Sequence, residues 1–218
     1  MRRERWISLS QIAETRLTVK KSVFIAEAGP LASAEEARIR MDEIRKRYPD
    51  ATHHVYAWRV SREEIMQKYS DDKEPSGTAG LPVLDVLRKN GIEDAIVVVT
   101  RYFGGTQLGT GGLARAYGEV AAEAVREAVP CVFAAAARYE IRVEFPLFER
   151  LKYVLEKEGF PVDRVMYRDC PVIQILCPKN SEDRLAQICS DHTSGRSTPV
   201  FVEDAEMIVE RVGETRNE

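Results

Sequence analysis

The sequence predicts an α+β protein built from two domains. Its 218 residues are enough for two small domains, and the 44% hydrophobic and 31% charged content is ordinary for a globular chain. Strand and helix patterns fill residues 14–128, break at Val129-Pro130, and start again as a complete unit from Arg138. No internal repeat and no low-complexity tract interrupts either half.

Capping and turn residues define the elements of the first half. Ser33 with Glu36, and Ser61 with Glu64, each form a capping box that begins a helix, and Asn90-Gly91 ends another helix. The expected strands are residues 14–22, 24–28, 54–60 and 95–100; the expected helices begin at Ser33 and Ser61 and span residues 82–89 and 111–128.

The second half has the order strand, helix, strand, strand, helix, strand, which is typical of the ferredoxin-like fold. Pro146 opens the first of these helices, where its missing amide costs nothing. The expected elements are residues 139–144, 146–158, 162–167, 172–177, 181–192 and 200–209. We therefore place the domains at residues 1–134 and 138–211.

Composition excludes some classes of function. A net charge of −3 does not by itself indicate a nucleic-acid or membrane partner. No apolar run approaches the ~20 residues that a membrane span needs, and no apolar segment of a signal peptide follows the charged N-terminus. The four cysteines form no C-x-x-C pair, and we expect buried free thiols.

A glycine-rich loop between residues 101 and 117 is the strongest functional signal. It follows a buried strand and leads into a helix expected near Gly111, with Thr110 as its capping residue. Unobstructed amides at a helix start, flanked by arginines, are the chemistry of an anion site. The candidate residues for binding an anion or nucleic acid are Arg101, Gly104, Gly105, Gly109, Thr110, Gly111, Gly112 and Arg115.

The loop has three other interpretations. The glycines could serve only a tight, closely packed strand-to-helix crossing. The spacing Gly104-x-x-x-x-Gly109 resembles a nucleotide-binding P-loop, but Thr110-Gly111 replaces its Lys-Ser/Thr pair. A relaxed dinucleotide-binding fingerprint also fits badly, because the glycines lie too far from the strand end.

The polar loop of residues 70–80 forms a candidate second segment of the site. Its three carboxylates could hold a hard cation such as Mg²⁺, but Asp and Ser also organise turns, and Thr78 could cap the next helix. We favour the turn interpretation and predict neither a metal nor a cofactor. The candidate residues of this segment, with one histidine from the preceding strand, are His53, Asp71, Asp72, Glu74, Ser76, Gly77 and Thr78.

The strand that begins at His53-His54 places its two histidines on opposite faces, so they cannot both serve one site. Tyr56 and Trp58 share the face of His54. These rings could stack on nucleobases, although aromatic residues on a sheet usually belong to the core. We identify no catalytic nucleophile in the chain, since Ser76 lacks the elbow motif and no cysteine has an activating neighbour.

The two loops together closely resemble the signature of the Impact/YigZ family. The matching segments are Asp71-Asp72-x-Glu74-Pro75-Ser76-Gly77-Thr78-Ala79-Gly80-x-Pro82 and Thr100-Arg101-Tyr102-Phe103-Gly104-Gly105-x-x-Leu108-Gly109-Thr110-Gly111-Gly112-Leu113-x-Arg115-Ala116-Tyr117. Lys73, Val23 and Gln107 depart from the family pattern, and the last two remove positive charge near the expected site.

The resemblance implies a ribosomal-protein-type N-terminal domain of two layers, a small mixed sheet with helices on one face. It also implies a cytoplasmic protein and a C-terminal domain like a terminal domain of elongation factors. Eukaryotic relatives are described as regulators of translation that act through protein partners, and nucleic-acid binding has been suggested for bacterial ones. We expect no membrane association.

Three functions follow as hypotheses. The first is a translation-associated binding protein that contacts RNA, the ribosome or a regulatory protein through the glycine-rich anion site. The second is an enzyme acting on a phosphorylated or carboxylated small molecule, with or without a metal ion, in which Asp71, Asp72 or His53 is the acid, base or metal ligand. The third is a regulator that binds only proteins. The first is preferred, and no enzyme activity is assigned.

Overall fold

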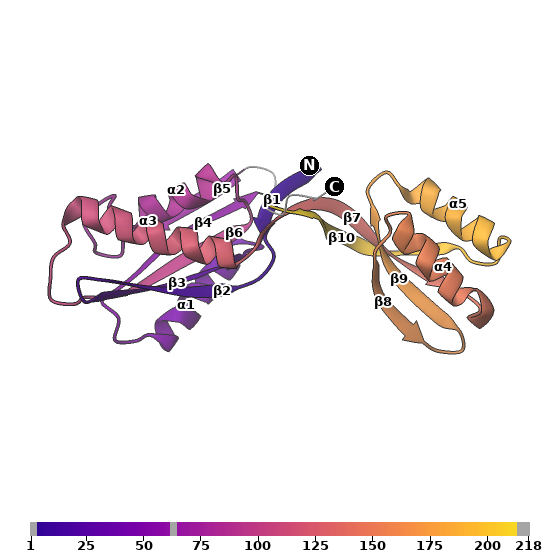
Figure 1. Cartoon of the computed structure of the whole chain (residues 1–218), viewed down its shortest axis with the longest axis horizontal. Coiled ribbons are helices and arrows are strands. Elements are labelled where there is room, and N and C mark those ends of the chain that lie inside the picture. The colour runs from indigo at the N-terminus through magenta and orange to yellow at the C-terminus, as the bar shows by residue number, and fades with distance from the viewer. Residues whose placement is uncertain (1–3, 62–64, 213–218) are drawn as a thin grey trace. The chain divides into compact units, whose positions relative to one another are not determined.

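The computed structural model describes residues 4–61 and 65–212. These residues fall into two compact units, Trp6–Val132 and Phe133–Val209, each of which is described by itself (Figure 1). Both units combine helices with an antiparallel sheet, so the predicted α+β class is confirmed. The domain limits proposed from the sequence place the boundary a few residues further along the chain.

The first unit is built on the sheet β2-β3-β6-β4-β5. Every neighbouring pair in that order is antiparallel, so the mixed sheet implied by the family resemblance is wrong. Its elements are β2 (Ala13–Val19), β3 (Ser22–Pro30), α1 (Ala34–Arg47), β4 (His53–Ser61), β5 (Ile65–Ser70), α2 (Gly80–Lys89), β6 (Ala95–Tyr102) and α3 (Gly109–Glu127), preceded by β1 (Arg5–Leu9).

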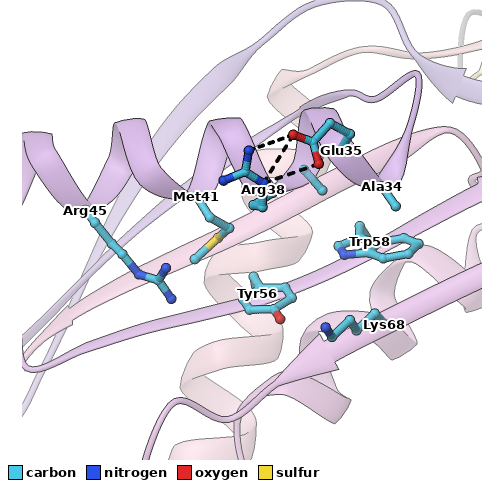
Figure 2. A pocket seen from close by; sticks show the side chains of 9 residues that line it. Ala34, Glu35, Arg38, Met41, Arg45, Tyr56, Trp58 and Lys68 are labelled. Carbon is cyan, nitrogen blue, oxygen red and sulfur yellow. Dashed lines mark hydrogen bonds and ion pairs between the residues drawn. The ribbon is translucent and has the colours of Figure 1, made fainter.

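Helices cover both faces of this sheet, rather than the one face that was expected. Val97 and Val99 of β6 pack with α2 and α3, whereas Ile96 and Val98 pack with α1 (Figure 1). The reason lies in β6 itself, which is apolar at every position from 95 to 99 and must be buried on both sides. Figure 2 shows the α1 face, where Met41 lies above the aromatic side chains of β4.

One predicted helix is a strand. Of the predicted capping box, Ser61 is the last residue of β4 and Glu64 lies outside the described residues. Residues 65–70, expected to be helical, form β5, which pairs with β4 from Ser61↔Ile65 to Tyr56↔Ser70. The sequence pattern suggested a helical start, but pairing with the free edge of β4 satisfies the backbone of this short segment.

The second unit confirms the predicted strand and helix order. Its elements are β7 (Pro130–Arg142), α4 (Phe145–Lys157), β8 (Val162–Tyr167), β9 (Pro171–Pro178), α5 (Glu182–Thr193) and β10 (Pro199–Arg211). Strand β9 lies between β7 and β8, and β10 pairs with β7. Apolar residues of α4 and α5, including Leu151 and Leu185, pack against Ile173 and Ile175 of the sheet.

The cysteines are free, and Cys131, Cys177 and Cys189 are buried, as predicted. Burial raises the pKa of Cys177 to about 11 and that of Cys189 to about 12, so both thiols stay protonated near neutral pH. In the part of the chain that the structure describes, no helix is both long and apolar enough to cross a membrane.

Candidate functional site

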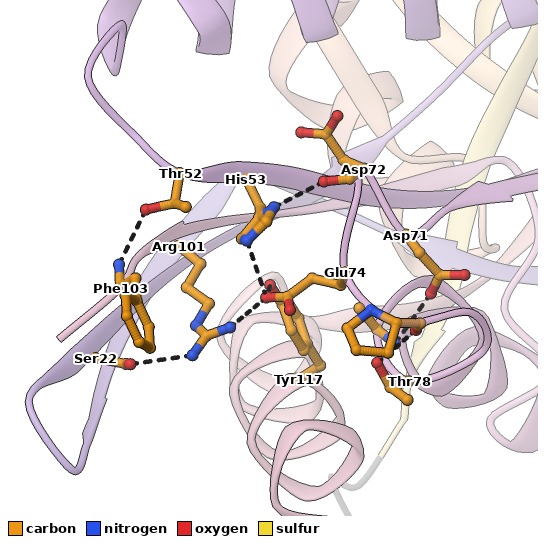
Figure 3. Close-up of polar contacts among 12 residues, drawn as sticks. Ser22, Thr52, His53, Asp71, Asp72, Glu74, Thr78, Arg101, Phe103 and Tyr117 are labelled. Carbon is orange, nitrogen blue, oxygen red and sulfur yellow. Dashed lines mark hydrogen bonds and ion pairs between the residues drawn. The ribbon is translucent and has the colours of Figure 1, made fainter. Parts of the chain in front are cut away.

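A buried ion pair joins the end of β6 to the polar loop before α2 (Figure 3). A guanidinium nitrogen of Arg101 lies 2.5 Å from Glu74 Oε1, and both side chains are only 4% exposed. The same guanidinium donates a hydrogen bond of 3.1 Å to Ser22 Oγ and stacks near the rings of Phe24 and Phe103. The charge of Arg101 is therefore neutralised by Glu74, and its side chain is buried inside the protein.

Tyr117 and His53 complete the cluster from α3 and β4. The Tyr117 hydroxyl donates to Glu74 Oε1 at 2.8 Å. Burial, with the Glu74 carboxylate beside it, raises the pKa of Tyr117 far above its ordinary value, so this hydroxyl remains a donor. His53 Nδ1 lies 2.7 Å from the Asp72 carbonyl oxygen, which can only accept, so Nδ1 carries a hydrogen.

With the hydrogen on Nδ1, the other ring nitrogen of His53, Nε2, faces the cluster. Nε2 faces Glu74 Oε1 at 3.6 Å and holds a proton only when the imidazole is charged. His54, on the opposite face of β4, is buried beside Thr100, and burial lowers its pKa. The two histidines thus lie on opposite sides of the sheet, as the strand alternation predicted.

The other carboxylates of the polar loop hold the loop in shape. Asp71 accepts hydrogen bonds from the amides of Gly77, Ala79 and Gly80, at 2.9, 3.0 and 2.8 Å. Asp72 accepts one of 2.6 Å from the amide of His54. Among the described residues, no group of three or more His, Cys, Asp or Glu side chains is placed to hold a metal ion.

Two predicted helix caps are wrong. The Thr78 hydroxyl donates back to the Pro75 carbonyl at 2.7 Å, and α2 is preceded by Ala79 without a side-chain cap. Helix α3 begins at Gly109, two residues earlier than expected, so Thr110 lies inside its first turn and Leu108 precedes it. Leu108 has no group that could accept the first amides, which leaves this helix start uncapped.

The two arginines of the predicted anion site differ in their surroundings. Arg101 is buried and paired, whereas Arg115 is exposed and has no polar partner within the described ranges of the chain. Thr110 and Gly111, at the uncapped start of α3, are also exposed. The accessible positive charge at this helix start therefore comes from its amides and from Arg115 rather than from Arg101.

A cavity of about 420 Å³ lies between the ion-pair cluster and the start of α3. It brings together candidate residues from three separate parts of the sequence. Its lining residues are Thr52, His53, Glu74, Pro75, Arg101, Phe103, Gln107, Leu108, Gly109, Thr110 and Leu113. The other candidates, which do not line it, are Gly104, Gly105, Gly111, Gly112, Arg115, Asp71, Asp72, Ser76, Gly77 and Thr78.

Tyr117 was not among the predicted site residues, although it bonds to Glu74 in the cluster. A signal was available, because a buried tyrosine hydroxyl needs a hydrogen-bond partner. Thr52 was also missed, because nothing in its sequence neighbourhood marks it as a site residue. Its hydroxyl accepts a hydrogen bond of 3.0 Å from the amide of Phe103 and so positions the start of the glycine-rich loop.

Conformation and packing account for most of the glycines in the loop. Gly105 and Gly109 have φ of 80° and 71°, a region that disfavours other residues. A Cβ on Gly104 would overlap the backbone of Lys21 and Ser22, and one on Gly112 would lie 3.2 Å from Leu108 Cβ. Gly111 has neither constraint, since it is helical and a Cβ there would meet open space.

Comparison with known proteins places the chain in a family. Residues 20–125 match the model of the Impact N-terminal domain. The IMPACT family member YvyE of Bacillus subtilis is 41% identical over 118 residues, 54% of each chain. An IMPACT family member of Thermus thermophilus is 35% identical over 179 residues, which cover 82% of this chain and 97% of the relative.

A solved structure described as a hypothetical protein has a TM-score of 0.59 and 28% identity, and the match covers 92% of this chain and 98% of that one. The chain belongs to the IMPACT family, and the resemblance to Impact/YigZ proteins is confirmed.

The glycine analysis predicts opposite effects of the same substitution at two positions. Gly104→Ala should lower the free energy of unfolding by about 2–3 kcal/mol, because the new methyl group meets backbone that cannot move away. Gly111→Ala should leave it unchanged or raise it by up to about 1 kcal/mol, since alanine favours the helix. Urea unfolding followed by circular dichroism measures both, and equal effects would contradict this account.

The buried cluster predicts a large cost for removing one charge. Glu74→Gln should lower the free energy of unfolding by about 3–5 kcal/mol, because Arg101 is left buried without a counter-charge. The matched control is Glu123→Gln, whose partner Arg126 is 67% exposed, and we expect at most about 0.5 kcal/mol there. A cost at Glu74 as small as that at Glu123 would show that the ion pair is not a structural constraint.

Proposed function

We propose that this protein is a cytoplasmic, translation-associated binding protein whose N-terminal unit contacts an anionic partner, in the first place the phosphate backbone of RNA or of the ribosome. Membership of the IMPACT family supports the association with translation. A translation-regulating protein with an acidic surface would satisfy the same chemistry.

The observation that carries the proposal is the uncapped start of α3 at the edge of the cavity. The first amides of a helix carry partial positive charge, and here no side chain of the described residues caps them. Exposed Thr110 and Gly111 leave this end open to a phosphate group, and Arg115, which has no polar partner among the described residues, lies further along the helix.

Arg101 has a different role in this proposal from the one its position in the sequence suggested. Its ion pair with Glu74 leaves no net charge to attract a ligand, so it shapes the cavity and fixes the loop. The affinity for an anion then depends on the backbone amides at the start of α3 and on Arg115.

One observation supports a second candidate, an enzyme that acts on a small phosphorylated or carboxylated molecule. His53 lines the cavity with Nε2 aimed at Glu74, and such an imidazole can act as an acid or a base. The other candidates for this role are Asp71, which is bonded within its loop, and Asp72, which accepts from the amide of His54 in β4; neither lines the cavity. Thermal-shift screening with phosphorylated metabolites separates an enzyme from a macromolecular binder.

A negative charge at the helix start tests the preferred function. Thr110→Glu should lower the affinity for purified ribosomes and for single-stranded RNA about tenfold, because the carboxylate repels phosphate from the amides. The same change should not destabilise the fold, since an acidic residue in the first turn favours the helix. Ribosome co-sedimentation and fluorescence anisotropy at low salt measure the two affinities.

Ser190→Glu is the matched control, since it adds the same charge to an exposed position of α5 and should change neither affinity by more than about twofold. Binding by the unaltered protein should weaken steeply as salt rises. Absence of any binding to RNA or ribosomes at low salt would overturn the nucleic-acid form of the proposal.

A further inference from the structure

A second cavity, of about 310 Å³, lies on the opposite face of the same sheet, between α1 and strands β4 and β5 (Figure 2). Alternation along β4 separates the two cavities, because His53 points to the α3 side and Tyr56 and Trp58 point to the α1 side. No residue of the glycine-rich loop lines this second cavity. A ligand bound here would therefore not depend on the anion site of the proposed function.

Two aromatic rings form the floor of this cavity. Tyr56 and Trp58 are two residues apart on β4 and point to the same face, as Figure 2 shows. Trp58 belongs to the α1 core, is 8% exposed and lines the cavity, and Tyr56 is half-buried. Helix α1 contributes Ala34 and Ala37 above this floor, and these small side chains leave space between helix and sheet.

The rim of the cavity is basic although the whole chain carries a net charge of −3. Arg38, Arg45 and Lys68 line it, against the single carboxylate of Glu35. Glu35 is paired with Arg38 at 2.7 Å, which leaves Arg45 and Lys68 as the charges available to a ligand.

These two cations are exposed and weakly engaged. Arg45 has one long contact of 3.6 Å with Asp42, and Lys68 has no polar partner in the portion of the chain described by the structure. Lys68 stands directly across from Trp58 in the register of β4 and β5, so its ammonium group belongs to the same face as the aromatic floor. Figure 2 shows Arg45 and Lys68 extending toward Tyr56 from the helix and from the sheet.

We propose that this cavity binds a nucleotide unit, with the base stacked on Tyr56 and Trp58 and the phosphate held by Arg45 and Lys68. A flat π-system is the group that an aromatic floor prefers, and the two exposed cations attract a negative charge. The volume suits one nucleotide, since it lies at the small end of the range for ligand pockets. The unit is either a free nucleotide or one residue of a single-stranded RNA.

Tryptophan fluorescence of the full chain tests the proposal directly, because the protein has two tryptophans. Titration with AMP and, separately, with an octamer of adenylate should quench the emission as the base stacks on Trp58. Trp58→Phe should remove the quenching while it keeps the affinity, measured by anisotropy of the labelled octamer, within about threefold. Quenching that persists in Trp58→Phe would assign the effect to Trp6 and overturn the proposal.

Charge and stacking are then separated by two further variants. Tyr56→Ala should weaken binding about tenfold, and Lys68→Glu should weaken it by a similar factor and reduce its salt dependence. Lys89→Glu is the matched control, since it reverses an exposed charge at the end of α2 and should have less than a twofold effect.

The two sources of the nucleotide predict different results. A free nucleotide as ligand predicts that AMP binds as tightly as the octamer, whereas an RNA residue predicts at least tenfold tighter binding of the octamer. Either result supports the proposed nucleotide site if the binding is lost in Lys68→Glu. Folded Tyr56→Ala and Lys68→Glu proteins that bind like the unaltered chain would refute it. Thr110→Glu should leave the quenching unchanged, so failure here is distinct from failure of the proposed function.

Discussion

The buried ion pair between Arg101 and Glu74 is the constraint on which the site depends. A charge removed from water is costly unless it is paired, so each of these residues fixes the position of the other. Through Ser22, Tyr117 and the contact with His53, the pair joins β3, β6, α3, β4 and the polar loop at one point. The glycine-rich loop therefore begins next to a residue that is bonded to several other elements.

The same pair changes how the site can attract a partner. An arginine beside a glycine-rich helix start suggests an anion cradle, but here the protein supplies its own carboxylate to that arginine. What remains accessible is the uncapped start of α3 and the exposed Arg115, while His53 lines the cavity. The arrangement suits a surface that recognises phosphate by shape and partial charge, and the second cavity adds an aromatic floor on the other face of the sheet.

Much of the fold could be predicted from local signals. The capping box at Ser33 is present, since the Ser33 hydroxyl accepts from the amide of Glu36, and the order of elements in the second unit follows from strand and helix periodicity. Long-range pairing could not be predicted. No local signal shows that Glu74 pairs with Arg101, 27 residues later in the chain, or that pairing with β4 makes β5 a strand. The start of α3 was also misplaced, because Leu108 rather than Thr110 precedes the helix.

The most direct test of the account is a phosphate titration of the full chain followed by amide nuclear magnetic resonance. If the open helix start supplies the affinity, the amide signals of residues 109–112 should shift in a saturable manner while the Arg101 Nε–H signal stays in place. Unchanged amides at residues 109–112, or a first response at Arg101, would show that the ion pair with Glu74 yields to ligand and that the account is wrong.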